Sequence, residues 1–155
     1  MPKITLEPIP PDGRMNGRPS AASEIARMAI DATIATPGYG SRQAPWVGYA
    51  AFAGDACVGT CAFKDAPLDG RVEIAYFAFP DHEGRGIATA MARELVALAR
   101  AADDGLTIVA RTLPAPGAST RVLEKLRFVR AGTVDDPQAG PVWEWRLAPE
   151  PSHVR

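Results

Sequence analysis

Residues 72–89 read VEIAYFAFPDHEGRGIAT, and this stretch determines the expected fold. Its first eight residues are apolar on both alternating faces apart from Glu73, which is typical of a central strand covered on both sides. Pro80 and Asp81 should end that strand. A helix should begin at Ile87, because apolar residues recur at helical spacing from there to Ala102. The stretch therefore predicts a central strand, a short loop and a long helix in direct succession.

The loop has two glycines, Gly84 and Gly86, directly before the helix. The first N–H groups of a helix lack intrahelical partners and its dipole attracts anions, so this junction suits a phosphate group. The glycines let a ligand approach the backbone, Arg85 adds a cation and Thr89 adds a hydroxyl. The pattern matches neither the dinucleotide fingerprint nor the phosphate loop of nucleotide hydrolases. From these residues alone, anion binding and a plain glycine-rich turn both stay open.

The flanking sequence alternates between strand-like and helix-like patterns. A helix should start at Ser20 and stop before Pro37. The order of strand 72–79, helix 87–102 and strand 106–112 predicts a parallel crossover unit. We therefore expect an α/β (α+β) fold with a mixed sheet and helices on both faces. The other expected elements are strands at 47–52, 56–64, 128–134 and 142–147 and a helix at 119–126.

Length and composition indicate one domain over residues 1–155, with loosely ordered ends near residues 8–19 and 149–155. The formal net charge of -1 gives no footprint for nucleic acid or an anionic membrane surface. Apolar runs are too short for a spanning helix, so we expect a cytoplasmic protein. Cys57 and Cys61 lie in one expected strand and should be packing residues rather than a disulfide or metal ligands.

Two motifs in the correct order resemble the GNAT superfamily of N-acetyltransferases. Residues 83–88, EGRGIA, resemble its pyrophosphate loop [QR]xxGx[GA], with Glu83 in place of Gln or Arg. Residues 118–128, ASTRVLEKLRF, resemble its downstream helix motif NxxSxxxxxKxGF. The resemblance covers residues 46–147, is strongest to the branch with the ribosomal-protein N-terminal acetyltransferases, and implies a mostly antiparallel sheet of six to seven strands. Three further departures are Pro116 for Asn, Arg127 for Gly, and Leu123 where many members carry a Tyr general acid.

The resemblance also implies a site that uses acetyl-CoA as co-substrate, with no metal. Its pantetheine arm would run beside the central strand, and its pyrophosphate would lie on the loop. Glu73 is the candidate catalytic base, because desolvation on its strand face would raise its pKa. The alternative is that Glu73 pairs with Arg71 or another cation. The expected cofactor-binding residues are Phe77, Ala78, Phe79, Gly84, Arg85, Gly86, Ile87, Ala88, Thr89 and Ser119.

Other candidate residues are weaker. Tyr76 alternates to the face opposite Glu73 and should pack in the core, and His82 should be a solvated loop residue. The acceptor pocket should be shaped by residues 37–46 and by the hairpin at 135–143. The expected acceptor is the primary amine of a small molecule or of a peptide N-terminus. The resemblance adds a homodimer as an expectation, because dimers are common in that family.

Three functions are compatible with these observations. The first is an N-acetyltransferase in which the amine attacks the thioester directly within a ternary complex. The second is a catalytically degenerate acyl-CoA-binding sensor or interaction module, suggested by the missing Tyr, Asn and Gly. The third is an unrelated nucleotide-binding domain.

Overall fold

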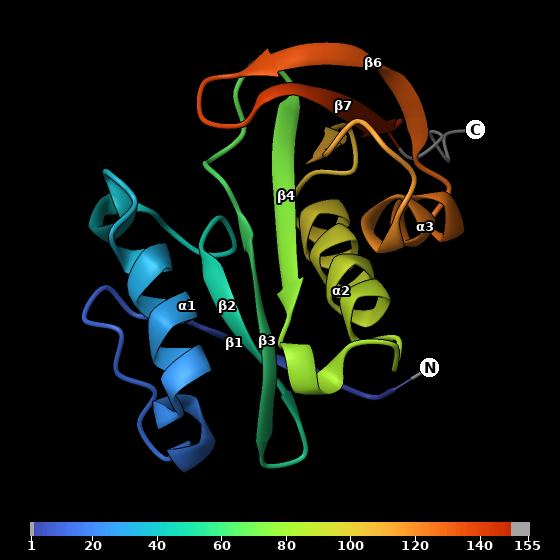
Figure 1. The fold of residues 1–155 in the computed structure, drawn as a ribbon. Helices are drawn as coiled ribbons and strands as arrows, with labels where there is room; N and C mark the ends of the chain where they lie inside the picture. The colour runs from blue at the N-terminus through green and yellow to red at the C-terminus, as the bar shows by residue number, and fades with distance from the viewer. Residues whose placement is uncertain (1, 150–155) are drawn as a thin grey trace.

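The computed structural model describes residues 2–149 as a mixed α/β fold built on a seven-stranded sheet (Figure 1). The strand order is β1-β2-β3-β4-β5-β7-β6, which confirms the expected fold class and the range of six to seven strands. The strands are β1 (Thr5–Pro8), β2 (Gly48–Ala53), β3 (Ala56–Phe63), β4 (Arg71–Ala78), β5 (Thr107–Thr112), β6 (Val129–Asp136) and β7 (Gly140–Leu147).

Neighbouring strands pair antiparallel except for β4 and β5, which are parallel. The helix α2 (Ile87–Ala102) joins these two strands, so the expected crossover unit is confirmed. Its bounds agree with those expected from the spacing of its apolar residues. β4 lies between β3 and β5, in the middle of the sheet.

The pairing of β4 with β5 stops halfway along β4. The register runs from Arg71 opposite Thr107 to Ile74 opposite Ala110, and within residues 2–149 no strand continues it. On its other side, β4 stays paired with β3 as far as Ala78, which lies opposite Gly59. β4 therefore has an open backbone edge along its second half.

Helices cover both faces of the sheet (Figure 1). α1 (Glu24–Ile34) lies on one face, while α2 and α3 (Ala118–Lys125) lie on the other. α2 inserts Met91 and Leu95, both fully buried, into a core that also contains Ile74 of β4. Among residues 2–149, no helix combines the length and hydrophobicity that a membrane crossing requires.

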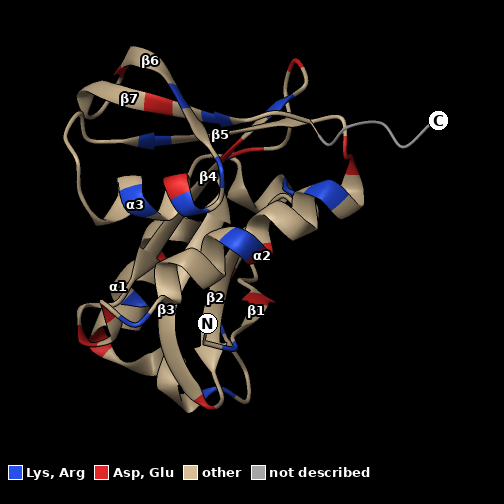
Figure 2. Ribbon diagram, turned by 90° about the vertical axis from the view of Figure 1, so that its right-hand side faces the viewer, with Lys and Arg blue, Asp and Glu red and all other residues tan. Residues whose placement is uncertain are grey.

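Charged residues are distributed unevenly over the strands (Figure 2). β2 and β3 contain none, because they are buried between α1 and α2. β5, β6 and β7 carry acidic and basic side chains that meet in one polar network. Both halves of the sheet contribute buried residues to the core, but β5, β6 and β7 carry most of the sheet's charges.

The N-terminal region differs from the expectation in two ways. α1 begins at Glu24 rather than Ser20, because the hydroxyl of Ser23 caps the N–H of Ala26 at 3.3 Å. The Ser20 hydroxyl instead donates to the carbonyl of Asp55 and accepts from the N–H of Cys57, so it ties this segment to the β2–β3 turn.

The segment expected to be loose near residues 8–19 follows β1, a strand that the sequence analysis missed. Ile9 is 2 % exposed, and Arg18 forms an ion pair with Glu7. These contacts hold the segment against the sheet edge. Of the other end expected to be loose, 149–155, residues 150–155 lie outside the described residues.

The expectation that β4 is covered on both sides is wrong. Val72 and Ile74 are buried against α2, but Ala75 and Phe77 on the opposite face are exposed, Phe77 to 41 %. α1 lies over β2 and β3 and leaves this part of β4 open. The uncovered face forms one wall of a pocket described below.

Cys57 and Cys61 are both buried and unbonded to one another. Burial raises the pKa of both thiols, so they stay protonated and unreactive near neutral pH. This confirms that they are packing residues.

Candidate functional site

The loop between β4 and α2 has the backbone conformation that its glycines allow. Gly84 and Gly86 have φ of 76° and 79°, in the left-handed region that other residues avoid. Gly86 caps α2, and the hydrogen-bond ladder of the helix begins with the N–H of Ala90 bonded to the Gly86 carbonyl. The N–H groups of the first turn therefore have no intrahelical partner, which is the arrangement that binds phosphate groups.

A pocket of about 420 Å³, here called the loop pocket, lies at this junction. Its walls are the open half of β4, the loop, the first turn of α2 and one side of α3. The lining residues are Tyr76, Phe77, Ala78, His82, Glu83, Gly84, Gly86, Ile87, Ala88, Thr89, Ala118, Ser119, Arg121, Val122 and Lys125.

The loop pocket brings together eight of the ten residues expected to bind the cofactor, from Phe77 at one end to Ser119 at the other. Two are not part of its wall. Phe79 is 2 % exposed and packs into a cluster with Ile9 and Phe52 on the α1 side of the sheet. Arg85 is exposed to solvent outside the pocket lining.

The sequence analysis missed two cations of the loop pocket, Arg121 and Lys125 on α3. Both are exposed, and their spacing of four residues places them on one face of the helix. The sequence does contain a signal for these two cations. Ser119 already predicted that α3 lies beside the loop, and side chains four residues apart on that helix share one face. The two side chains give the pocket positive charge suited to an anionic ligand.

Tyr76 lies at the boundary between core and loop pocket. It packs against the core as expected, but its hydroxyl also reaches the pocket wall and donates to the Ser119 carbonyl at 3.1 Å. Burial raises the pKa of this hydroxyl, so it stays protonated at neutral pH. The contact links β4 to the N-terminus of α3 across the loop pocket.

The open edge of β4 offers backbone hydrogen-bonding groups to the loop pocket. The carbonyl of Glu73 accepts from Lys64 N–H, and the N–H of Phe79 donates to the Val58 carbonyl, both toward β3. Because these directions alternate along a strand, the polar groups of Tyr76 and Ala78 point the other way, toward the gap beside β5. An extended ligand in the gap could pair with them as an additional strand does.

A second pocket of about 400 Å³, here called the α1 pocket, lies on the other face of β4. α1, β3 and the segment after α1 form its walls. Phe77 lines both pockets, so they meet at this residue of β4. The lining residues are Met28, Ala29, Ala32, Thr33, Thr36, Tyr39, Arg42, Thr60, Ala62, Phe63, Lys64, Ala75 and Phe77.

The expected acceptor region agrees with the α1 pocket only in part. Tyr39 and Arg42 line it, but Trp46 instead packs edge-on against Phe63, with ring centroids 5.0 Å apart. No residue of the 135–143 hairpin lines it. The sequence analysis did not predict that α1 forms a wall of this pocket. Helical periodicity identifies the apolar face of α1, but not which residues of that face the sheet leaves uncovered.

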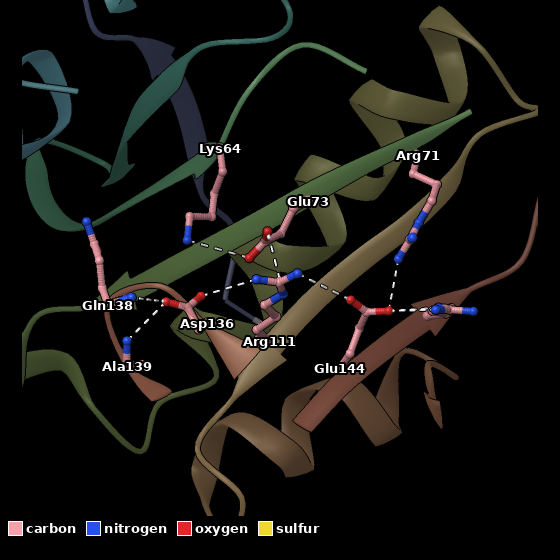
Figure 3. A network of polar contacts seen from close by, with 9 residues as sticks. Lys64, Arg71, Glu73, Arg111, Asp136, Gln138, Ala139 and Glu144 are labelled. Atoms are coloured by element: carbon pink, nitrogen blue, oxygen red, sulfur yellow. Dashed lines mark hydrogen bonds and ion pairs between the residues drawn. The ribbon is translucent and has the colours of Figure 1, made fainter. Parts of the chain in front are cut away.

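Glu73 lies in a network of charged side chains rather than in an apolar setting (Figure 3). Its carboxylate is 3.6 Å from Nζ of Lys64 and 4.0 Å from Nε of Arg111, and the side chain is 23 % exposed. The expected desolvated environment is therefore wrong. Arg71, the partner first considered for Glu73, pairs with Glu144 at 2.9 Å.

Arg111 is the centre of this network. Its guanidinium donates to Asp136 at 3.2 Å and lies 3.6 Å from Glu144, while its Nε–H is buried without a hydrogen-bond partner among the described residues. Backbone N–H groups of Gln138 and Ala139 bond to Asp136 and hold its pKa below the usual value, with Arg111 adding to the effect. β4, β5, β6 and β7 are thus connected through one side chain.

Glu144 is the buried acid of the network, 3 % exposed. Burial acts to raise its pKa, but hydrogen bonds from Arg146 and the charges of Arg71 and Arg111 outweigh it and hold the pKa below the usual value. This carboxylate therefore stays ionised and pairs with three cations, Arg71, Arg111 and Arg146. Within residues 2–149, the His, Cys, Asp and Glu side chains form no group of three arranged as metal ligands.

The fold is similar to those of solved acetyltransferases. RimL, a ribosomal alpha-N-protein acetyltransferase, is 15 % identical with a TM-score of 0.71, covering 98 % of this chain and 97 % of its own. The putative acetyltransferase yncA from Salmonella typhimurium, solved with acetyl-CoA, is 20 % identical with a TM-score of 0.69, covering 97 % and 96 %. A GNAT acetyltransferase from Bacillus anthracis is 19 % identical with a TM-score of 0.58, and the match spans 65 % of each chain.

Sequence comparison identifies the family independently of the fold. No curated protein sequence matches the chain. The family model described as an acetyltransferase (GNAT) domain matches residues 13–129, which include α1, β4, the glycine loop, α2 and α3. The chain therefore belongs to the GNAT acetyltransferase family.

Proposed function

We propose that the protein transfers an acetyl group from acetyl-CoA to a primary amine, by direct attack in a ternary complex. The main supporting observation is that the loop pocket and the α1 pocket lie on opposite faces of β4 and meet at Phe77. An acyl donor in one pocket and an amine in the other would come together there without a covalent enzyme intermediate.

The loop pocket fits the acyl donor. The unpartnered N–H groups at the start of α2 would bind the pyrophosphate, with Gly84 and Gly86 giving it access to the backbone. Arg121 and Lys125 add positive charge beside it. The open edge of β4 at Tyr76 and Ala78 would bond the amides of the pantetheine arm. These residues match the chemistry of a long ligand with an anionic end and an extended amide arm.

The reaction requires a neutral amine. Its nitrogen attacks the thioester carbonyl carbon, the C–N bond forms, and the C–S bond breaks to release the thiolate of CoA. A backbone N–H of the open β4 edge would stabilise the developing negative charge on the carbonyl oxygen. The amine must lose a proton for this attack, since a primary amine is mostly protonated at neutral pH.

Glu73 is the proposed base for that proton. It lies on the same face of β4 as Ala75 and Phe77, which line the α1 pocket, and four residues before Phe77, or roughly 13 Å along the strand. Across that distance, shortened by the reach of the side chains, the carboxylate would accept the proton through a chain of water molecules. Its ion pair with Lys64 would hold it at the end of the pocket.

A second candidate function is acyl-CoA binding without catalysis. It is favoured by Leu123, which occupies the place of the usual Tyr general acid and is fully buried. In this case the protein would sense acyl-CoA or bind a partner in its presence.

Titration calorimetry with acetyl-CoA, followed by a thiol-release assay, separates the candidates. The assay should include polyamines, aminoglycosides, amino acids, ω-amino acids and short peptides with free N-termini. Acetyl-CoA binding with release that depends on an amine supports the transferase. Binding without release for any amine supports the sensor, and thermal protection by ATP but not by CoA would contradict both.

A further inference from the structure

We propose that the α1 pocket accepts a primary amine joined through an apolar segment to a carboxylate, rather than a polyamine or another multiply charged cation. This inference rests on the proposed transferase function and specifies its acceptor. It follows from three features of the pocket: its apolar wall, the sign of its charged residues and their distance from Phe77.

The wall of the α1 pocket is mainly apolar near the point where the pockets meet. α1 contributes Met28, Ala29 and Ala32, and the sheet contributes Ala62 and Ala75. Met28 is 59 % exposed despite its size, so this wall is open to a ligand. The volume of about 400 Å³ is at the low end of the range for small-molecule pockets. A hydrocarbon segment of an acceptor would fit against this surface.

The charged residues that line the α1 pocket are both cations, Arg42 and Lys64. Arg42 is held in place, because its guanidinium donates to the carbonyls of Phe63 at 2.8 Å and Lys64 at 2.5 Å. Its Nε lies 3.9 Å from Asp65, which is a solvent-exposed carboxylate outside the lining. The pocket therefore carries positive charge that suits an anionic group and repels a second ammonium group.

The cations lie at the end of the pocket away from Phe77. Thr60 is opposite Phe77 in the β3–β4 register, and the N–H of Lys64 bonds to the carbonyl of Glu73. Phe77 and Glu73 are four residues apart on β4, which corresponds to roughly 13 Å along the backbone. The side chains shorten the distance that an acceptor must span. An acceptor with its amine at Phe77 would thus need its anionic group several bonds away, as in an ω-amino acid.

Glu73 offsets part of the charge of Lys64 but leaves the lining of the α1 pocket itself cationic. It is the acid nearest to Lys64, and it is shared between Lys64 and Arg111 outside the pocket lining. A single carboxylate already flanked by two cations is poorly placed to bind the distal ammonium of a diamine.

Three amines of equal chain length test the inference: 6-aminohexanoate, hexylamine and 1,6-diaminohexane, which end in an anion, a neutral methyl group and a cation. We expect kcat/KM for acetyl transfer to fall in that order, with 6-aminohexanoate at least about fivefold better than hexylamine. Lys64→Gln should reduce this ratio toward 1. Arg93→Gln, which removes one exposed positive charge from α2 outside both pockets, should leave the ratio unchanged.

Each result of this experiment has a defined meaning. Equal or better transfer to hexylamine or 1,6-diaminohexane overturns the inference while the transferase function stands. Acetyl transfer to peptides or aminoglycosides, without transfer to any of these three amines, also overturns the inference and leaves the transferase function standing. A preference for 6-aminohexanoate that Lys64→Gln and Arg42→Gln each leave intact also overturns it, because neither cation of the pocket then recognises the carboxylate. Failure to acetylate any amine in the wider panel overturns the transferase function itself.

Discussion

Lys64 and Glu73 face one another across the β3–β4 pair through both backbone and side chain. The N–H of Lys64 donates to the Glu73 carbonyl at 2.9 Å, and Nζ of Lys64 lies 3.6 Å from the Glu73 carboxylate. The acid proposed as the base therefore lies next to the cation proposed to bind the acceptor, at the end of the α1 pocket that Lys64 lines. Changes at these two residues should affect different kinetic parameters.

Glu73→Gln should lower kcat by about 100-fold or more while the KM for acetyl-CoA stays unchanged, because the variant loses the proton acceptor and leaves the loop pocket intact. Glu94→Gln, which removes an exposed carboxylate from α2, is the matched control and should behave like the wild type. Wild-type turnover of Glu73→Gln near neutral pH would remove Glu73 from the mechanism.

The cations of α3 should contribute to acetyl-CoA affinity. Arg121→Gln and Lys125→Gln should each raise the Kd by about threefold to tenfold, and the double variant should show a weaker dependence of Kd on salt. Arg85→Gln provides the comparison, since Arg85 lies in the loop but outside the pocket lining. Titration calorimetry at two salt concentrations compares the wild type with all four variants. If Arg85→Gln lost more acetyl-CoA affinity than the double variant, the phosphates would lie on the side of the loop away from α3.

The end of α3 contains a residue in a strained conformation. Arg127 has φ of 70°, and the bonds from Arg127 N–H to Glu124 and from Phe128 N–H to Leu123 form a left-handed helix cap. Arg127→Gly should therefore raise the free energy of unfolding by about 0.5–1 kcal/mol. Urea denaturation measures this change, and an equal or lower stability of the variant would show that the cap is not strained.

The charge network predicts a specific dependence of stability on pH. The folded-state pKa of Glu144 is below its usual value of 4.5, so its stabilising effect is complete above that pH and is lost as the pH falls through the folded value. Glu144→Gln leaves Arg71, Arg111 and Arg146 without their shared acid and should cost about 1–3 kcal/mol at pH 7.

Urea denaturation of wild type and Glu144→Gln at pH 7, 5 and 4 tests this prediction. The difference in unfolding free energy between the two proteins should be largest at pH 7 and smaller at pH 4. A difference that grows as the pH falls would have the wrong sign for a carboxylate with a lowered pKa.

The sequence was sufficient for the fold where local patterns are strong. The bounds of α2 and its crossover from β4 to β5 followed from the spacing of apolar residues between Ile87 and Ala102. β1 was missed, because its four residues are too short for a pattern and pair with β2 only in the folded chain. The start of α1 was misplaced, since Ser20 and Ser23 are both good caps and only the β2–β3 turn distinguishes them.

The lining of the loop pocket was predictable where its residues lie in one contiguous segment or in the motif that includes Ser119. The glycine loop and the first turn of α2 form one segment, and Gly84, Gly86 and residues 87–89 line the loop pocket together, although Arg85 does not. The surroundings of Glu73 were not predictable, because Lys64, Arg111 and Asp136 come from three other strands. The sequence analysis also did not predict the exposed face of β4. An apolar sequence pattern is the same for a strand face that a helix covers and for one that a ligand covers.

Hydrogen–deuterium exchange with and without acetyl-CoA tests the central claim most directly, that the co-substrate lies along the open edge of β4 with its pyrophosphate on α2. The amides of Tyr76, Ala78 and residues 87–89 should exchange more slowly when acetyl-CoA is bound. Protection absent from both segments, or confined to the surface between α3 and β6, would contradict the proposed site.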